Sequence, residues 1–119
     1  MKLLKKNFDK DGSGFVVLVP EESDDLWQLY NLIAAGDDVR AATVRKVQVG
    51  DRAGVMDKKH ITLTLLVKSV DFDAKGDCLR IAGTNNSENE FVKMGAHHTL
   101  EINLNTKLTK KFMKEISKF

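Results

Sequence analysis

The run from His60 to Phe72, HITLTLLVKSVDF, constrains the fold most, because its apolar residues change phase part of the way along. From Ile61 to Val67 every second residue is apolar, which predicts a strand with one buried face. Val70 and Phe72 then fall on even positions. A β-bulge or sharp bend between Leu66 and Ser69 would return them to the same face. The pattern therefore predicts a strand that turns the corner of a small, strongly bent sheet.

Further runs of the chain have the composition of strands. β-Branched and aromatic residues concentrate between turn signals such as Asp-Gly and Ser-Gly. Together these runs predict a mainly β domain, an antiparallel sheet of five or six strands bent into a small β-barrel. The expected strands cover residues 2–8, 14–20, 38–49, 60–72, 78–83 and 98–104.

Two amphipathic helices are expected beside the sheet. The first covers about residues 23–35, since Ser23 is a suitable N-cap, acidic residues fill the first turn and Gly36 ends it. The second lies in the tail, where apolar residues recur at helical intervals without a C-cap signal. Its stripe consists of Leu108, Phe112, Ile116 and Phe119. Because that helix has no stop, we expect residues 1–119 to be the first domain of a longer protein.

Length and composition indicate one folded domain. The chain has 119 residues, of which 42% are hydrophobic and 30% charged, so it can form a single core. Lysines interrupt its N-terminus after two leucines, so we expect no signal peptide or membrane span there. A single cysteine, Cys78, rules out an internal disulfide and fits a reducing compartment.

The stretch from Asp9 to Glu22, DKDGSGFVVLVPEE, begins like a calcium-binding EF-hand loop. Its twelfth residue, which must be a bidentate glutamate in such a loop, is counted here at Pro20. The apolar run before this proline indicates a strand. We therefore interpret the stretch as a hairpin turn between two strands.

Basic and amide side chains gather around two long polar loops, residues 49–59 and 83–98. Loops of this length in a compact domain are more often functional than neutral. Guanidinium and ammonium groups suit a phosphate backbone, read by charge and shape rather than by base sequence, although a solvated surface is the plain alternative. The predicted RNA-binding or ribosome-binding residues are Arg45, Lys46, Arg52, Lys58, Lys59, Asn85, Asn86, Lys93 and His98.

Signals for catalysis and metal binding are weaker. His97 and His98 are adjacent, so in a strand they point to opposite faces and do not share a metal. The sequence contains no phosphate-binding loop, dinucleotide fingerprint or nucleophile elbow. The enzymatic alternative is a metal-dependent nuclease built on Glu21 and Glu22, with the aspartates that follow them. The start of the helix already explains those aspartates, because negative charge is favoured in the first turn. We expect no cofactor, and a divalent metal would be needed only by the nuclease.

Five longer segments cover nearly all of the chain: MKLLKKN, LVPEESDDLWQLYNL, GDDVRAATVRKVQ, TLTLLVKSVDFD and LRIAGTNNSENEFVKMGAHHTLEI. Together they resemble the N-terminal domain of the Pelota family of eukaryotic and archaeal ribosome-rescue factors, which is related to the eukaryotic termination factor. The match looks close to the eukaryotic branch. This resemblance implies an Sm-like barrel as the first of three domains.

The resemblance also implies a role at the ribosome. Family members enter the empty A site of a ribosome stalled on damaged or truncated message, with a translational GTPase of the Hbs type. They help to split the subunits and feed no-go and nonstop decay. Their N-terminal domain occupies the decoding region, and its loop between the third and fourth strands approaches the message channel; here that loop matches residues 49–59. The implied protein is a cytoplasmic monomer, with a nuclear pool allowed, whose partners are small-subunit ribosomal RNA, mRNA and the GTPase.

Two motifs of termination factors are missing from the sequence. The glycine-glycine-glutamine tripeptide that hydrolyses peptidyl-tRNA is absent, and so is the asparagine-isoleucine-lysine-serine motif that reads stop codons. The resemblance therefore implies A-site occupancy without codon reading or peptide release. A contested endonuclease activity is proposed for this domain in the family, and the acidic stretch after Pro20 matches its region. We expect a binding module and keep the RNA endonuclease as the alternative.

Overall fold

The computed structural model describes residues 1–48 and 56–112, which form one antiparallel sheet and a helix. The strands lie in the order β1-β2-β7-β3-β4-β5-β6, so the last strand of the described chain is inserted between β2 and β3. This confirms a mainly β fold with one helix. In the same residues no helix is both long and apolar enough to cross a membrane. The elements are β1 (Lys2–Phe8), β2 (Gly14–Val19), α1 (Ser23–Leu32), β3 (Asp38–Gln48), β4 (Met56–Asp73), β5 (Cys78–Asn85), β6 (His97–Asn103) and β7 (Leu108–Phe112).

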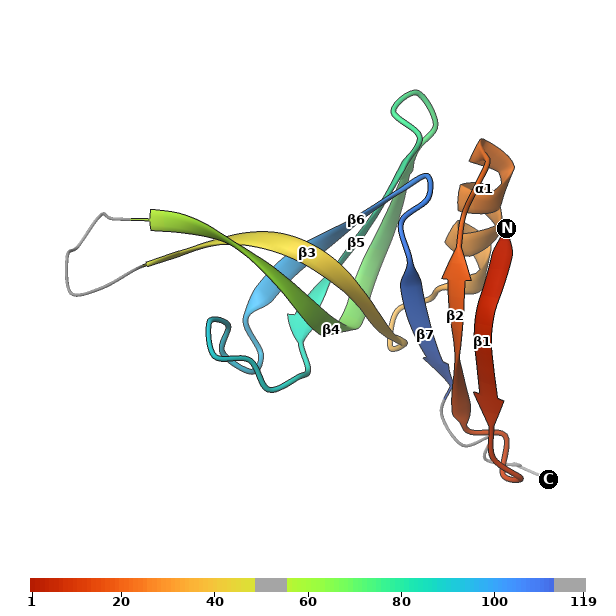
Figure 1. The fold of residues 1–119 in the computed structure, drawn as a ribbon, viewed down its shortest axis with the longest axis horizontal. Coiled ribbons are helices and arrows are strands. Elements are labelled where there is room, and N and C mark those ends of the chain that lie inside the picture. The colour runs from red at the N-terminus through yellow and green to blue at the C-terminus, as the bar shows by residue number, and fades with distance from the viewer. Residues whose placement is uncertain (49–55, 113–119) are drawn as a thin grey trace.

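The long strand β4 joins the two halves of the sheet. Its first part, up to Leu66, pairs with β3, and its second part, from Leu65 onward, pairs with β5. Figure 1 shows the consequence: β3 and β4 project as a hairpin to one side, while β1, β2 and β7 run side by side next to α1 at the other. The extents of 55 × 35 × 23 Å reflect this projecting hairpin.

The sheet is not closed, so the predicted barrel of five to six strands is not confirmed. In the described part of the chain β1 and β6 are the end strands, and each pairs with a single neighbour. The sheet has seven strands instead of the predicted five or six, because β7 is inserted between β2 and β3. The half from β3 to β6 is nevertheless curled: Thr43 Oγ1 on β3 lies 2.7 Å from His98 Nε2 on β6, although β4 and β5 stand between these strands in the sheet.

The change of phase in β4 is a β-bulge, as the sequence predicts. The register of β4 against β5 shifts between Val67 and Ser69. Val70 and Phe72, beyond the bulge, pack against the core. One extra residue on β4 thus keeps both parts of the strand facing the same core and bends the sheet between them.

The tail forms a strand, so the predicted C-terminal helix is wrong over residues 108–112. β7 pairs with β2 on one side and with β3 on the other. Lys110 occupies a buried position, 5% exposed, with its Nζ 3.5 Å from Asp37 Oδ2 and 3.8 Å from the ring centroid of Phe112. A lysine on the core face interrupts the apolar and polar alternation by which a strand is recognised in a sequence. It is tolerated there because its apolar stem packs inside while its ammonium is paired. The rest of the predicted helix, residues 113–119, lies outside the described residues.

The core fills the concave side of the sheet under α1. Leu26 and Leu29 of the helix are completely buried. Each fully buried aliphatic side chain contributes about 1.5–3 kcal/mol, so this layer fixes the body from which the hairpin projects. The strand residues buried with them include Leu63, Leu65, Leu79, Ile81, Leu100 and Ile102.

The helix starts and ends differently from the prediction. Its N-cap is Glu22 rather than Ser23, because Asp25 in the first turn accepts the N–H of Glu22 at 3.0 Å. Its last residue is Leu32, and Ile33 already has extended backbone angles. The helix is therefore shorter than the predicted span of about 23–35.

Gly83 provides a test of the bulge. It lies opposite Val67, and a Cβ at this position would overlap the carbonyl oxygen of Leu66. We expect Gly83→Ala to lower the free energy of unfolding by about 1–3 kcal/mol, because backbone must move. Gly76→Ala, where the atoms nearest to a Cβ belong to the side chain of Asp73 rather than to backbone, is the control. Equal urea midpoints for the two variants would contradict this account.

Candidate nucleic-acid interface

Four of the predicted basic residues form two like-charge pairs across the projecting hairpin. Arg45 of β3 lies opposite Lys59 of β4, and Lys46 lies opposite Lys58. Adjacent residues of a strand point to opposite faces, so each face of the hairpin carries one pair. Like charges directly opposite each other in a sheet destabilise it. A polyanion that neutralised them would remove that cost.

Arg45 and Lys59 form the inner pair, on the face of the hairpin that turns towards the second loop and β6. Arg45 Nη1 donates to the His97 carbonyl oxygen at 2.7 Å and lies 3.2 Å from His98 Nδ1. Since an arginine only donates, Nδ1 accepts, and Nε2 of the neutral ring donates to Thr43 Oγ1 at 2.7 Å. Burial, and then the Arg45 charge, lower the pKa of His98 below its ordinary value of 6.5. Arg45 and His98, predicted as contact residues, therefore also fasten the hairpin to the body.

Lys59 faces the same side but is only partly engaged. Its Nζ lies 3.7 Å from Asp57 Oδ2 and 5.6 Å from the ring centroid of Phe91. Phe91 is 40% exposed and Met94, on the same loop, 60%. Sequence reasoning missed this aromatic residue, because the contact between Phe91 and the hairpin depends on the curl of the sheet. An exposed ring beside a cation is suited to stacking on a base.

The outer pair is open to solvent. Lys46 and Lys58 are exposed, and neither is in an ion pair with any residue that the structure describes. His60, two residues along β4 from Lys58, is exposed too. This face of the hairpin therefore offers two ammonium groups in register to an incoming anion. Arg52, predicted as a contact residue in the loop of residues 49–59, falls outside the described residues.

The prediction that Asn85 contacts a ligand is contradicted by its position. Asn85 is 2% exposed, and its Nδ2 donates to the carbonyl oxygens of Ser87 and Val92 at 3.0 and 3.1 Å. Its Oδ1 accepts from the N–H and hydroxyl of Ser87. A buried amide with these partners shapes the loop and has no free group for RNA. Asn86, whose Nδ2 donates to Asp38 Oδ1 at 3.2 Å, and Lys93 remain exposed on the loop surface.

Two of the acidic side chains after Pro20, Glu21 and Asp25, contact other groups of the domain. Asp25 Oδ2 accepts the N–H groups of Glu21 and Glu22 at 2.9 and 3.0 Å and lies 2.9 Å from the Met1 amino group. These contacts hold the pKa of Asp25 below its ordinary value, the amino group contributing most. Glu21 also lies 3.9 Å from the Lys2 ammonium. Glu22 and Asp24 are exposed.

The structure confirms the hairpin interpretation of the stretch that begins at Asp9. β1 and β2 pair directly around it, and the Ser13 N–H and hydroxyl donate to Asp11 Oδ1 at 2.9 and 2.6 Å. Over residues 1–48 and 56–112, no group of three or more histidine, cysteine or acidic side chains is arranged to hold a metal ion. The acidic side chain of the turn thus serves the hairpin.

The fold and this surface define a class: a mainly β domain with a projecting basic hairpin beside a structured second loop. A family model described as the Pelota N-terminal domain matches residues 1–117. The chain belongs to this family. It is 50% identical to the human protein pelota homolog and 48% identical to that of Danio rerio, each over 111 residues. These matches cover 92% of this chain and 29% of each relative, so the chain spans less than a third of their length.

Solved structures of the family share the fold. The crystal structure of Archaeoglobus fulgidus Pelota superposes with a TM-score of 0.69 at 27% identity, covering 93% of this chain and 28% of that one. A model of ribosome-bound archaeal Pelota and ABCE1 gives a TM-score of 0.70 at 32% identity, covering 92% and 31%. Dom34 of S. cerevisiae, at 22% identity with a TM-score of 0.69 and coverage of 93% and 29%, shows the fold alone.

The half-buried His98 ring predicts a pH dependence of stability. Its pKa is lowered in the folded state, so it contributes stability above pH 6.5 and loses that contribution as the pH falls below 6.5 towards the lowered pKa. We expect the unfolding free energy of the unaltered chain to fall over this range. His98→Gln, which keeps a side-chain donor near Thr43, should lack this component. Urea unfolding from about pH 7.5 to about pH 5 measures it, and identical profiles would contradict the assignment.

Proposed function

We propose that this domain acts in ribosome rescue by occupying the decoding region of an empty A site, with its hairpin against small-subunit RNA and mRNA. The observation that carries this proposal is the pair of in-register like charges on each face of the hairpin. Such pairs weaken a free hairpin, since like charges across a sheet repel. RNA phosphates would convert that repulsion into attraction, with release of the counterions condensed on the RNA.

The shape of the domain suits this role. The hairpin projects from the body (Figure 1), so it can enter a channel that the sheet itself cannot. The contacts of Arg45 with His97 and His98 fix its direction relative to β6. A charged projection held in one direction loses less conformational entropy on binding than a mobile one. Contacts to phosphate then orient the domain without reading the sequence of the message.

The wider setting is carried over from the family. The chain matches, at 32% identity, an archaeal Pelota that is ribosome-bound together with ABCE1, which supports the ribosome as partner. We infer that the longer protein has three domains, acts as a cytoplasmic monomer with an Hbs-type translational GTPase, promotes subunit dissociation and feeds no-go and nonstop decay. The present chain corresponds to 29% of such relatives, so these activities belong to the proposal for the whole protein.

The first test removes the outer pair of charges. We expect Lys46→Ala with Lys58→Ala to weaken binding of the chain to small ribosomal subunits roughly tenfold or more, because charged hydrogen bonds are lost. The slope of log affinity against log salt should also become shallower by about 0.7–0.9 for each lost phosphate contact. The matched control is Lys68→Ala with Lys75→Ala, two exposed lysines away from the hairpin. Equal affinities for the two double variants would overturn the proposed surface.

A second arm separates binding from the endonuclease alternative. The longer protein and its GTPase are added to ribosomes stalled with an empty A site, and subunit splitting and message length are followed together. We expect Lys46→Ala with Lys58→Ala to slow splitting while the message stays whole. Cleavage that needs divalent metal and disappears with Glu21→Ala and Glu22→Ala would establish the nuclease instead.

A further inference from the structure

A second basic region lies on the same outer face of the sheet, towards β7. Three cationic side chains from β3, β7 and the turn before β7 line a hollow of about 560 Å³. Threonines from β4, the turn and β7 also line it. The polar groups that line it are Arg40, Lys107 and Lys111 with Thr62, Thr106 and Thr109.

Strand pairing explains how residues so distant in sequence meet. Arg40 pairs with Thr109 across β3 and β7, and Ala42 pairs with Thr62 across β3 and β4. Residues directly opposite each other in an antiparallel pair share a face, and so do alternate residues of one strand. Arg40, Ala42, Thr62 and Thr109 therefore lie on one face. Ala42, which also lines the hollow, carries only a methyl group and so takes up little space there.

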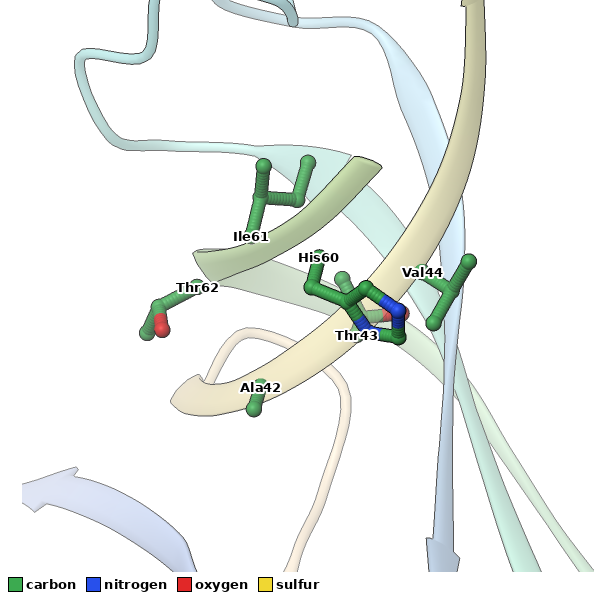
Figure 2. Close-up of a pocket in the computed structure, with 6 residues that line it drawn as sticks. All are labelled: Ala42, Thr43, Val44, His60, Ile61 and Thr62. Atoms are coloured by element: carbon green, nitrogen blue, oxygen red, sulfur yellow. The ribbon is translucent and has the colours of Figure 1, made fainter. Parts of the chain in front are cut away.

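The hollow is continuous with the outer face of the hairpin. A neighbouring depression of about 360 Å³ shares Ala42 and Thr62 with it and extends to His60. Figure 2 shows the His60 ring reaching from β4 across β3 towards Val44, while Ile61 points to the other side of β4. The alternation that places Arg40 and Ala42 on this face also places Lys46 there. Lys46 lies six residues along the strand from Arg40, a path of about 20 Å, long enough for several nucleotides.

The charges around the hollow favour an anion. Within residues 1–48 and 56–112, none of Arg40, Lys107 and Lys111 is in an ion pair. The acidic neighbours are Asp38, which lies opposite Lys111 and accepts a hydrogen bond from the Asn86 side chain, and Glu101, which lines an adjoining depression that shares Ala42 and Thr106 with the hollow. Two carboxylates against three cations leave a net positive charge around the hollow. A guanidinium with hydroxyl donors around it matches the oxygen atoms of a phosphate.

We propose that this hollow is a second phosphate-binding site, which holds the backbone of the same RNA that the hairpin contacts. The inference rests on the proposed function and extends it, since two anchoring points about 20 Å apart fix the direction of the domain on the RNA, whereas one point leaves it free to rotate. RNA is favoured over a small phosphorylated ligand, because the hollow is one end of a positive face that continues to Lys46 and Lys58.

The test compares three double variants of the chain in binding to small ribosomal subunits across a range of salt concentrations. The hollow variant is Arg40→Gln with Lys111→Gln, the hairpin variant is Lys46→Gln with Lys58→Gln, and the control is Lys68→Gln with Lys75→Gln, two exposed lysines that line neither surface. We expect the first two each to lose roughly tenfold in affinity, with a shallower salt slope, and the control to match the unaltered chain. Urea unfolding establishes that all variants remain folded.

The outcomes separate this inference from the proposed function. If the hairpin variant loses affinity and the hollow variant matches the control, the second site is overturned and the proposed function stands. If neither loses affinity, both are overturned. Ala42→Glu gives an independent reading, because a carboxylate at the centre of the hollow should repel phosphate; unchanged binding would overturn the second site. Binding of inorganic triphosphate to the hollow, with RNA affinity unaffected by its variants, would overturn it in favour of a small ligand.

Discussion

The register of β3 on β4 is the constraint on which the rest of the structure depends. At one end of this pairing, Val39 lies opposite Leu65 and the two side chains are buried in the core. At the other end, the same register sets Lys46 against Lys58 outside the body. A slip by one residue would exchange the two faces of β4, exposing leucines and burying lysines. The burial of the core therefore determines where the basic pairs of the hairpin point.

The two faces of the hairpin have different roles. The inner face is tied to β6 through Arg45, His98 and Thr43, so it orients the hairpin. The outer face carries Lys46 and Lys58 in solvent and continues into the hollow around Ala42. The proposed binding of ribosomal RNA without codon reading needs both features, a hairpin held in one direction and cationic side chains that are free to meet phosphate.

Residues with local signals were predictable, and those that depend on tertiary contacts were not. The β4 bulge follows from the phase of Val70 and Phe72. These residues can lie on the same buried face as Ile61 to Val67 only if the strand contains one extra residue. β7 was missed because Lys110 is buried beside Asp37, a contact that only the folded chain reveals. The basic hairpin residues were predicted from their charge, and their contact with RNA remains a prediction. Asn85 was misassigned because an amide that shapes a loop and one that binds RNA look the same in a sequence.

The hairpin carries like-charge pairs at a cost to its own stability, and we propose that it uses them to bind RNA. The most direct measurement compares Lys58→Glu with the unaltered chain in two quantities. These are the unfolding free energy from urea titration and the affinity for small ribosomal subunits. The account predicts that the variant gains about 0.2–1 kcal/mol of stability, because Lys46 then faces an opposite charge. It also predicts weaker binding to the subunits. A variant that is no more stable, or that binds as tightly as the unaltered chain, would contradict the claim.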